Sequence, residues 1–361
     1  MTKAGTITSG VYRIPVRNLW LLMLYASTLY QQHNTRLLAA AEDNPEDLVD
    51  LVGEILVTAV ERRLARPLSH AYRDRRAVLT RVRGRIDALA TESRMLLDQG
   101  QVACTFDELT VDTARNRLLL TALHRASRVV DDVTTARRAR ALARTLIQYG
   151  VTADPTTWRT AAAARLGRNE RDDAEAVAAA ALLLNMLIPT EDAGGRAGRD
   201  PDRDAATIRA LYERAVRGFY RAELPPTWRV AAGETQRHWL TTETSPGMLA
   251  MLPTMRTDIE LEQHGRRVIV ETKFADALKP GFHGVRRLDR NHVFQLYAYV
   301  RSQSSRDELG RTADGVLLYP TVDSHFDESA VIDGHRFRFV TVDLAASAHD
   351  IRARLLSAIA L

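Results

Sequence analysis

Residues 255–274 read MRTDIELEQHGRRVIVETKF, and this stretch decides the fold of the second half of the chain. Two runs of β-forming residues, Thr257–Glu262 and Arg266–Phe274, flank a short turn-like sequence that ends in Gly265. Glycine tolerates the positive φ of a tight turn, and such a turn between two strand-like runs is typical of a hairpin. The stretch therefore predicts two antiparallel strands.

Two carboxylates face each other across this predicted hairpin. A two-residue loop, His264-Gly265, places Asp258 directly opposite Glu271, with Cβ atoms roughly 4.5–5.5 Å apart. Like charges in that arrangement destabilise a sheet, and the apolar run before Glu271 adds a desolvation cost. A divalent cation offsets both, since Mg²⁺ is held by one or two carboxylates together with waters and a phosphate oxygen. Asp258 and Glu271 are therefore the expected ligands of Mg²⁺, for which Mn²⁺ can substitute.

Lys273 completes the predicted catalytic set. It lies two residues beyond Glu271, hence on the same face of the strand, where it can orient or deprotonate an attacking water and stabilise the transition state. Asp258, Glu271 and Lys273 together favour metal-dependent hydrolysis of a DNA phosphodiester bond. The bare pattern is not specific, because exposed hairpins carry similar charges simply to stay soluble.

Two further polar residues are candidates for supporting roles. Glu213 lies beside the apolar face of a predicted helix, where it would add a carboxylate toward the metal. The alternative is an exposed ion pair with Arg209 or Arg217 at a spacing of four residues. Gln295 lies on a predicted helix and shares a face with Tyr299. It would position the attacking water or contact a phosphate, or it belongs to an ordinary polar helix face.

Composition defines the class of protein. The chain has 361 residues, 45% hydrophobic and 26% charged, which is typical of a globular protein with two domains. A net charge of +5 is compatible with a nucleic-acid partner but is also common without one. The single cysteine, Cys104, excludes an internal disulfide and favours the cytoplasm. We expect no signal peptide and no membrane segment, because the apolar runs are short and interrupted.

The chain is expected to divide near residue 190. Helical periodicity over 18–32, 46–64, 116–127, 135–148 and 174–187, with strands within 77–86, predicts an α+β N-terminal domain that is mainly helical and spans residues 1–190. Pro189 should end the last of these helices. Residues 191–204, rich in glycine and charge, should form a linker. A helix from about Ala206 to Pro225 and the strands after it predict a C-terminal α/β domain over residues 205–361.

Ordered matches along most of the chain resemble the McrC family, the nuclease subunit of McrBC-type restriction systems that act on 5-methylcytosine DNA. They are Ile14–Ala26, Val82–Asp87, Phe106–Asp112, Asn116-Arg117, Leu211–Arg214, Phe219–Leu224, Leu252–Ile259, Val268–Phe274, Gln295–Tyr299 and Gly315–Pro320. The resemblance implies that the C-terminal domain has the PD-(D/E)xK restriction-endonuclease fold with a mixed central sheet. It also implies that Asp258, Glu271 and Lys273 are catalytic and that Glu213 and Gln295 support them. Glu271 stands where the family often has Asp, within the variation of that position.

The resemblance further implies two partners, double-stranded DNA and an AAA+ GTPase hexamer of the McrB type. The N-terminal region would dock into the GTPase ring, with Arg81, Arg83 and Arg85 either in the contact or on a solvated face. The chain has no G-x-x-x-x-G-K-[ST] phosphate loop, so GTP would be bound by the partner. Antiviral restriction is the expected role. Two alternatives are a scaffold that stimulates the GTPase with a weak or silent nuclease, and a stand-alone PD-(D/E)xK repair nuclease.

Overall fold

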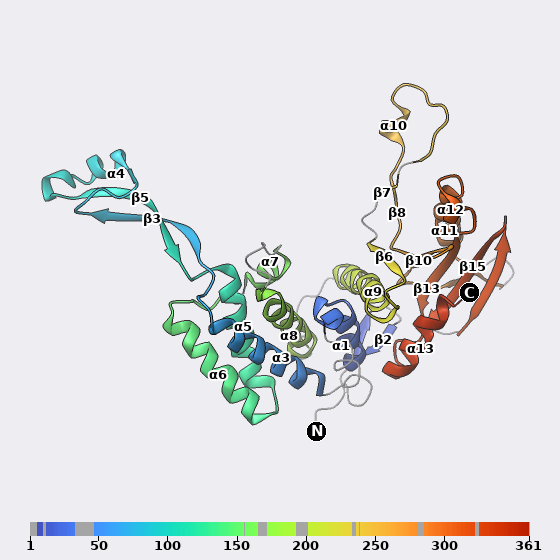
Figure 1. Cartoon of the computed structure of the whole chain (residues 1–361), viewed down its shortest axis with the longest axis horizontal. Coiled ribbons are helices and arrows are strands. Elements are labelled where there is room, and N and C mark those ends of the chain that lie inside the picture. Colours follow the sequence, from blue (N-terminus) through green and yellow to red (C-terminus); the bar gives the residue numbers. More distant parts are fainter. Residues whose placement is uncertain are drawn as a thin grey trace. The chain divides into compact units, whose positions relative to one another are not determined.

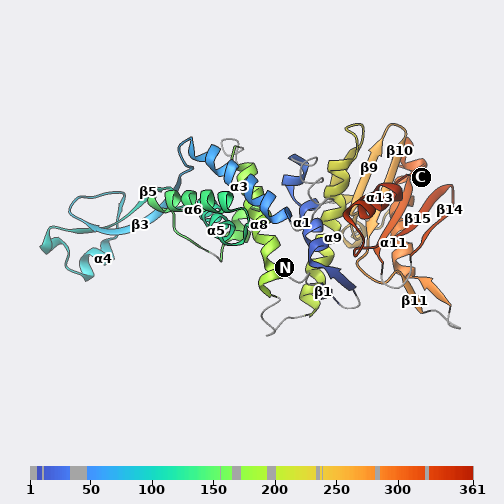
Figure 2. The same cartoon turned by 90° about the horizontal axis from the view of Figure 1, so that it is seen from below.

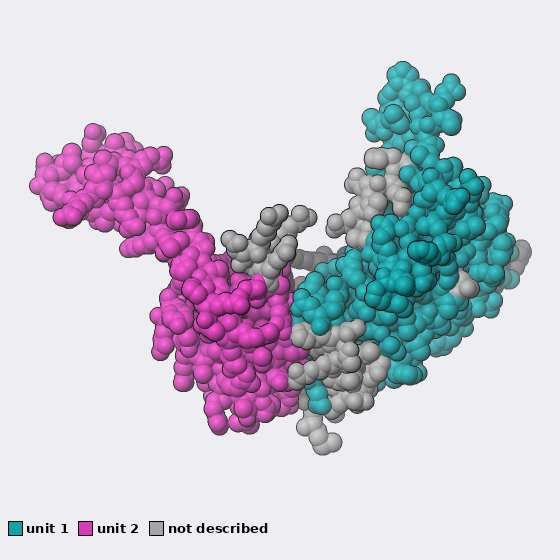
Figure 3. All heavy atoms as spheres, viewed as in Figure 1, with its two compact units in different colours: residues 1–48, 185–361 teal, residues 49–184 magenta. Residues whose placement is uncertain are grey.

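The computed structural model describes residues 6–9, 12–32, 47–154, 156–164, 172–192, 201–232, 236–237, 239–280, 285–321 and 325–360. The chain forms two compact units, shown in Figure 3. Unit 1 contains residues 1–48 and 185–361, and unit 2 contains residues 49–184. This grouping differs from the expected N-terminal domain of residues 1–190, because the first 48 residues belong with the C-terminal half.

Unit 1 is built on a six-stranded mixed sheet with the order β14-β15-β13-β10-β9-β6 (Figure 1). The central strands β10, β13 and β15 are parallel, and the three outer pairings are antiparallel. The mixed sheet expected in the C-terminal part is therefore confirmed. The strands are β6 (Arg229–Ala232), β9 (Ile259–Gln263), β10 (Arg266–Thr272), β13 (Asp314–Pro320), β14 (Asp327–Ile332) and β15 (His335–Val342).

Helices cover both faces of this sheet. The face that carries Ile269 and Leu317 packs against Leu296 and Val300 of α11 (Arg290–Gln303), with α12 (Glu308–Arg311) beside it. On the other face, Arg338 of β15 donates to the carbonyl of Ser357 in α13 (Ala348–Ala358). Helix α9 (Pro201–Glu223) joins α13 there, since the Tyr220 hydroxyl donates to the Leu355 carbonyl.

The hairpin of β9 and β10 has the predicted register. Gln263 pairs with Arg266 and Ile259 pairs with Val270, which leaves His264 and Gly265 as the two-residue loop. Gly265 has a φ of 73°, the left-handed conformation that favours glycine. The prediction of an antiparallel hairpin is therefore confirmed, and its local turn fixes which residues face each other.

The N-terminal segment of unit 1 packs along α9. It consists of β1 (Thr6–Ser9), β2 (Tyr12–Pro15) and α1 (Val16–Tyr25). A Cβ added at Gly218 of α9 would lie 1.9 Å from the Tyr25 carbonyl oxygen, so only glycine permits this approach of the two helices. This close packing explains why residues 1–48 group with the C-terminal half.

Three short elements extend from the sheet of unit 1. They are β7 (Gln236–Arg237) paired with β8 (Met255–Arg256), helix α10 (Met248–Met251), and the ribbon of β11 (Leu278–Pro280) and β12 (Arg286–Leu288). Figure 2 shows β11 standing out from the body of unit 1. The segment from β7 through α10 to β8 and the ribbon of β11 and β12 both adjoin the hairpin. Strand β8 precedes Asp258 in the chain, and β11 follows Lys273.

Unit 2 is a helical body with a small sheet. Its helices are α3 (Leu48–Leu64), α4 (Ala88–Ser93), α5 (Ala114–Val129), α6 (Val133–Gln148), α7 (Trp158–Ala163) and most of α8 (Ala174–Asp192), with a 3-10 turn at Leu97–Gln99. The strands β3 (Ala71–Leu79), β5 (Val102–Thr110) and β4 (Arg85–Ile86) form a three-stranded sheet in that order. Together with α4 they form a projection, which we call the finger (Figure 1). The sequence pattern predicts strands near β3 and β4 but not β5.

Two helix ends differ from their predicted positions. Helix α8 continues past Pro189 to Asp192, and α9 begins at Pro201 rather than near Ala206. Proline at the first position of a helix costs no hydrogen bond, because its missing N–H would have no intrahelical acceptor, and this suits Pro201. At Pro189 the helix loses one backbone hydrogen bond but continues to Asp192. The predicted linker is therefore shorter, and residues 193–200 of it lie outside the described residues. None of the described helices has the length and apolar composition of a membrane span.

Candidate active site

The hairpin brings Asp258 and Glu271 to the same face of the sheet. Asp258 directly precedes β9, and the register of that strand extends to place it opposite Glu271. Both residues share the face of Ile269, which packs against α11. The Asp258 carboxylate is oriented by Thr272, whose backbone N–H and hydroxyl donate to Oδ2 at 2.8 and 2.7 Å. The two predicted metal ligands therefore lie side by side.

Glu271 is a buried acid with an unsatisfied oxygen. It is 1% exposed, and within the described part of the chain its Oε2 atom has no hydrogen-bond partner. Burial and the neighbouring Asp258 charge raise the pKa of Glu271 to about 7, although Lys273 acts in the opposite direction. A buried carboxylate oxygen without a donor is costly, so it favours a cation as its partner.

Lys273 directly follows β10 and lies on the same face as Glu271. Its ammonium donates to Oε1 of Glu271 at 2.7 Å and to Oε1 of Gln295 at 2.9 Å. Its backbone N–H donates to the Leu318 carbonyl at 2.9 Å, which continues the pairing of β10 with β13. The predicted clustering of Glu271 and Lys273 on one face is confirmed, and two acceptors hold the lysine in place.

Gln295 reaches the site from α11. The Asp289 side chain caps this helix by accepting from the Asn291 N–H at 2.9 Å. The Gln295 amide then bridges the Lys273 ammonium to the Tyr299 hydroxyl, to which it donates at 2.9 Å. Tyr299 is half-buried, and desolvation is the main cause that raises its pKa. Gln295 thus contacts a predicted catalytic residue rather than solvent alone.

Glu213 touches the site only through a neighbour. It forms an ion pair with Arg217, four residues along α9, which is the alternative left open by the sequence. Arg217 in turn donates from Nε to the backbone carbonyl of Asp258 at 3.2 Å. Glu213 is therefore linked to the start of β9 through an arginine.

Sequence reasoning missed Thr272, which lies between Glu271 and Lys273 and orients Asp258. It named Arg217 and Tyr299 only through helical spacing, as neighbours of Glu213 and Gln295, and assigned neither of them to the site. The contact of Arg217 with Asp258 joins residues 41 positions apart and has no local pattern.

The residues present fit a hard divalent cation with few protein ligands. Two carboxylates are adjacent, and one buried oxygen lacks a donor. No group of three or more His, Cys, Asp and Glu residues with a metal-binding arrangement occurs in the described part of the chain. Mg²⁺ keeps several waters and needs only one or two carboxylates beside a phosphate, whereas structural zinc needs four protein ligands. The donor set therefore suits Mg²⁺ or Mn²⁺.

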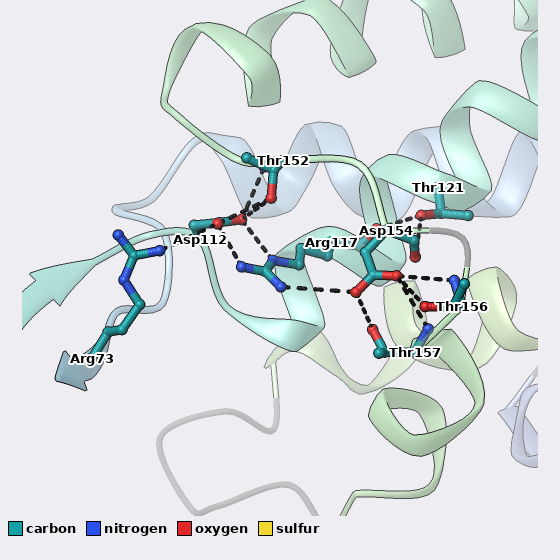
Figure 4. A network of polar contacts seen from close by, with 8 residues as sticks. All are labelled: Arg73, Asp112, Arg117, Thr121, Thr152, Asp154, Thr156 and Thr157. Atoms are coloured by element: carbon teal, nitrogen blue, oxygen red, sulfur yellow. Dashed lines mark hydrogen bonds and ion pairs between the residues drawn. The ribbon is translucent and has the colours of Figure 1, made fainter. Parts of the chain in front are cut away.

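Unit 2 contains a second polar cluster, at the base of the finger (Figure 4). Asp112, just after β5, accepts from Nε and Nη2 of Arg117 at 2.8 and 2.6 Å and from the Thr152 N–H at 2.9 Å. Asp154 lies 3.8 Å from Arg117 and accepts from the Thr156 N–H at 2.9 Å. These contacts join the finger to α5 and to the segment after α6, which indicates a structural role.

The three arginines that the sequence offered either as partner contacts or as a solvated face lie on the finger. Arg81, Arg83 and Arg85 are all exposed. The Arg83 guanidinium stacks over the Phe106 ring, 4.2 Å from its centre, so this arginine also packs against β5. The finger additionally exposes large apolar side chains, among them Tyr72, Leu89 and Met95.

Comparison with known proteins places these features in a family. The model of the McrBC 5-methylcytosine restriction system component family matches residues 5–320. The chain is 27% identical over 346 residues to the type IV methyl-directed restriction enzyme EcoKMcrBC of Escherichia coli K12, covering 95% of this chain and 96% of that protein. It also matches a chain of the McrB AAA+ hexamers with bound McrC from Thermococcus gammatolerans. That match has 12% identity and a TM-score of 0.40, and it covers 96% of this chain and 76% of the other.

Proposed function

Since the chain belongs to the McrBC 5-methylcytosine restriction system component family, we propose that it is the endonuclease subunit of such a system. It would hydrolyse phosphodiester bonds of double-stranded DNA in a Mg²⁺-dependent reaction, on a domain of the PD-(D/E)xK type. The observation that supports this most directly is the buried Glu271 carboxylate, adjacent to Asp258 and contacted by Lys273.

The protein groups have distinct roles in this proposal. Asp258 and Glu271 would hold the metal ion, which when bound polarises the phosphate and lowers the pKa of the attacking water. In the hydrolysis, the water oxygen bonds to phosphorus while a phosphorus–oxygen ester bond breaks. Lys273 places its ammonium where negative charge accumulates on the phosphate. Because its position is set by Glu271 and Gln295, little reorganisation is needed during the reaction.

The remaining residues act as positioning groups. Gln295 holds the Lys273 ammonium from α11, and Thr272 fixes the orientation of the Asp258 carboxylate. Glu213 holds Arg217, which anchors the backbone at Asp258. The sequence alone left open whether Glu213 approaches a metal. Its ion pair supports a role in holding the strand.

We also propose an AAA+ GTPase hexamer of the McrB type as the partner. This rests on the family and on the absence of a phosphate loop from the sequence, so that GTP would be bound by the partner. The exposed arginines of the finger, Arg81, Arg83 and Arg85, are the proposed contact. Recognition of 5-methylcytosine would then belong to the partner, and the nuclease would act in the cytoplasm as part of antiviral defence.

The test is cleavage of methylated duplex DNA in the presence of the partner GTPase, GTP and Mg²⁺. Asp258→Ala and Lys273→Ala should each lower the cleavage rate by at least about 10²-fold, because each removes charge stabilisation of the transition state. Both variants should still assemble with the partner. Glu328→Ala, which removes an exposed carboxylate on β14, is the control and should cleave normally.

Three results would overturn the proposal. Wild-type rates from both site variants would exclude this site. Stimulation of the GTPase by a wild-type chain that never nicks DNA would instead favour a scaffold subunit with a silent nuclease. Cleavage without any partner would favour the stand-alone repair nuclease.

A further inference from the structure

A basic two-stranded ribbon follows the candidate active site directly in the chain. Strand β10 ends at Thr272, Lys273 comes next, and β11 begins at Leu278. Strands β11 and β12 pair antiparallel, with Leu278 opposite Leu288 and Lys279 opposite Arg287. Figure 2 shows this ribbon standing out from unit 1.

The two faces of the ribbon have different environments. Leu288 packs against the core cluster that contains Leu296 of α11, and the Asp289 N–H donates to the carbonyl of the buried Ala277 at 3.3 Å. Successive side chains of a strand point to opposite faces, so Lys279 and Arg287 point away from the face that Leu288 anchors. Both residues are exposed. The ribbon is thus held by one face and presents two cations on the other.

These two cations have no acidic partner among the described residues. Their neighbour Arg286, by contrast, forms an ion pair with Asp276 at 2.9 Å and donates to the Leu278 carbonyl at 3.2 Å. Like charges directly opposite each other destabilise a two-stranded ribbon. The pair of Lys279 and Arg287 therefore weakens the fold of the ribbon, and an external anion would offset its repulsion.

The ribbon and the candidate active site both adjoin α11. His292 of α11 is half-buried, and its Nδ1 atom is 3.2 Å from the Tyr319 hydroxyl. Burial is the main cause that lowers the pKa of His292, the charges of Lys273 and Lys279 lower it further, and Asp289 opposes them. Leu288 of the ribbon packs against the core cluster that contains Leu296 of α11, and the adjacent Gln295 of α11 holds Lys273, so the ribbon and the candidate active site border the same region of unit 1.

We propose that Lys279 and Arg287 form a phosphate-binding surface that holds the DNA backbone beside the bond to be cut. This inference rests on the proposed nuclease function and adds that the ribbon of β11 and β12 binds the DNA substrate. A two-stranded ribbon fits the width of the DNA major groove, and contacts of lysine and arginine to phosphates carry no sequence information. The surface therefore suits an enzyme whose sequence recognition is supplied by a partner.

The experiment measures binding of the full-length chain to a fluorescein-labelled duplex by anisotropy, without metal, over a series of salt concentrations. The Lys279→Ala/Arg287→Ala variant should bind at least about ten-fold more weakly, as expected for the loss of two charged contacts. Its slope of log affinity against log salt should be shallower by about 2, because each lost phosphate contact removes about 0.9. Lys279→Arg/Arg287→Lys keeps both charges and should bind as the wild type does.

The control is Arg311→Ala/Arg336→Ala, which removes the same charge from two exposed arginines of unit 1 outside the ribbon. Equal affinity and equal salt slope in the ribbon and control variants would overturn the inference, as would failure of the wild-type chain to bind the duplex. The assay needs no cleavage. Failure of the ribbon inference is therefore distinguishable from failure of the proposed function. In the second case the wild-type chain would bind DNA but would not cut it with its partner.

Discussion

At the scale of single residues, the position of Glu271 costs the protein stability in two ways. It is almost fully buried, and it lies beside a second carboxylate, Asp258. Lys273 neutralises only part of this charge, since its ammonium contacts Oε1 and leaves Oε2 without a donor in the described part of the chain. The cost to stability is explained if the pair is completed by a metal ion during function.

The pKa of Glu271 gives a prediction about stability. In the folded chain it is raised from 4.5 to about 7, so between these values the folded state binds more protons than the unfolded state. The contribution of this group to the free energy of unfolding is therefore fully present below 4.5 and is lost as the pH rises through about 7. Glu271→Gln should remove that dependence. Urea unfolding of both proteins without metal, from about pH 5 to pH 8, measures the difference.

The same shift predicts proton release on metal binding. Below the pKa of Glu271, Mg²⁺ must displace a proton, so its affinity should rise up to about ten-fold per pH unit until the group is ionised. If the free energy of unfolding of wild type and of Glu271→Gln had the same pH dependence, the pKa of Glu271 would not be raised in the folded chain. This conclusion would hold whatever the cleavage activity of either protein.

At the scale of elements, the finger is held at its base by Asp112. This carboxylate follows β5 and joins it to Arg117 of α5 and to Thr152 beyond α6 (Figure 4). The hydrogen bonds from Arg117 are the main cause that lowers the pKa of Asp112 to about 2. Its stabilisation is thus present above the ordinary value of 3.8 and is lost as the pH falls toward 2.

Asp112→Asn should destabilise unit 2 by about 1–3 kcal/mol, because it leaves Arg117 without its carboxylate partner. The matched control is Glu108→Gln on β5, whose ion pair with Arg75 is exposed and contributes at most about 1 kcal/mol. Hydrogen exchange of α5 and β5 in the two variants tests this. Equal protection in both would show that the base of the finger does not depend on Asp112.

At the scale of the whole molecule, the two units carry separable parts of the proposed function. Each has its own buried core, the nuclease candidates all lie in unit 1, and the finger lies in unit 2. A change in the finger should therefore affect the partner GTPase without altering the carboxylates of the site.

Arg81→Glu/Arg85→Glu should lower stimulation of the partner GTPase by at least about ten-fold, since like charges placed in a contact oppose association. Asp258→Ala should leave that stimulation intact. Arg137→Glu/Arg144→Glu, with the same charge change on exposed positions of α6, is the control. Normal GTPase stimulation by the finger variant would exclude these arginines as the contact.

Local signals determined the hairpin and most helices. Helix α3 and helix α6 lie within two residues of their predicted bounds, because amphipathic periodicity and capping are local. Strand β5 was missed because its alternation is short: Cys104 and Phe106 are buried on one face, but the same face continues with the polar Glu108. The start of α9 was placed too late, since proline is favoured at the first position of a helix, as at Pro201, and α8 continues past Pro189, which was expected to end it.

The sequence by itself determined that Asp258 and Glu271 oppose each other, because a two-residue turn sets the register of a hairpin without help from the rest of the chain. Only the tertiary structure decided that Gln295 holds Lys273 and that Arg217 holds the backbone at Asp258. Those contacts depend on how α11 and α9 pack on the sheet. The assignment of residues 1–48 to unit 1 is likewise tertiary, because it depends on the close approach of α1 to α9 at Gly218.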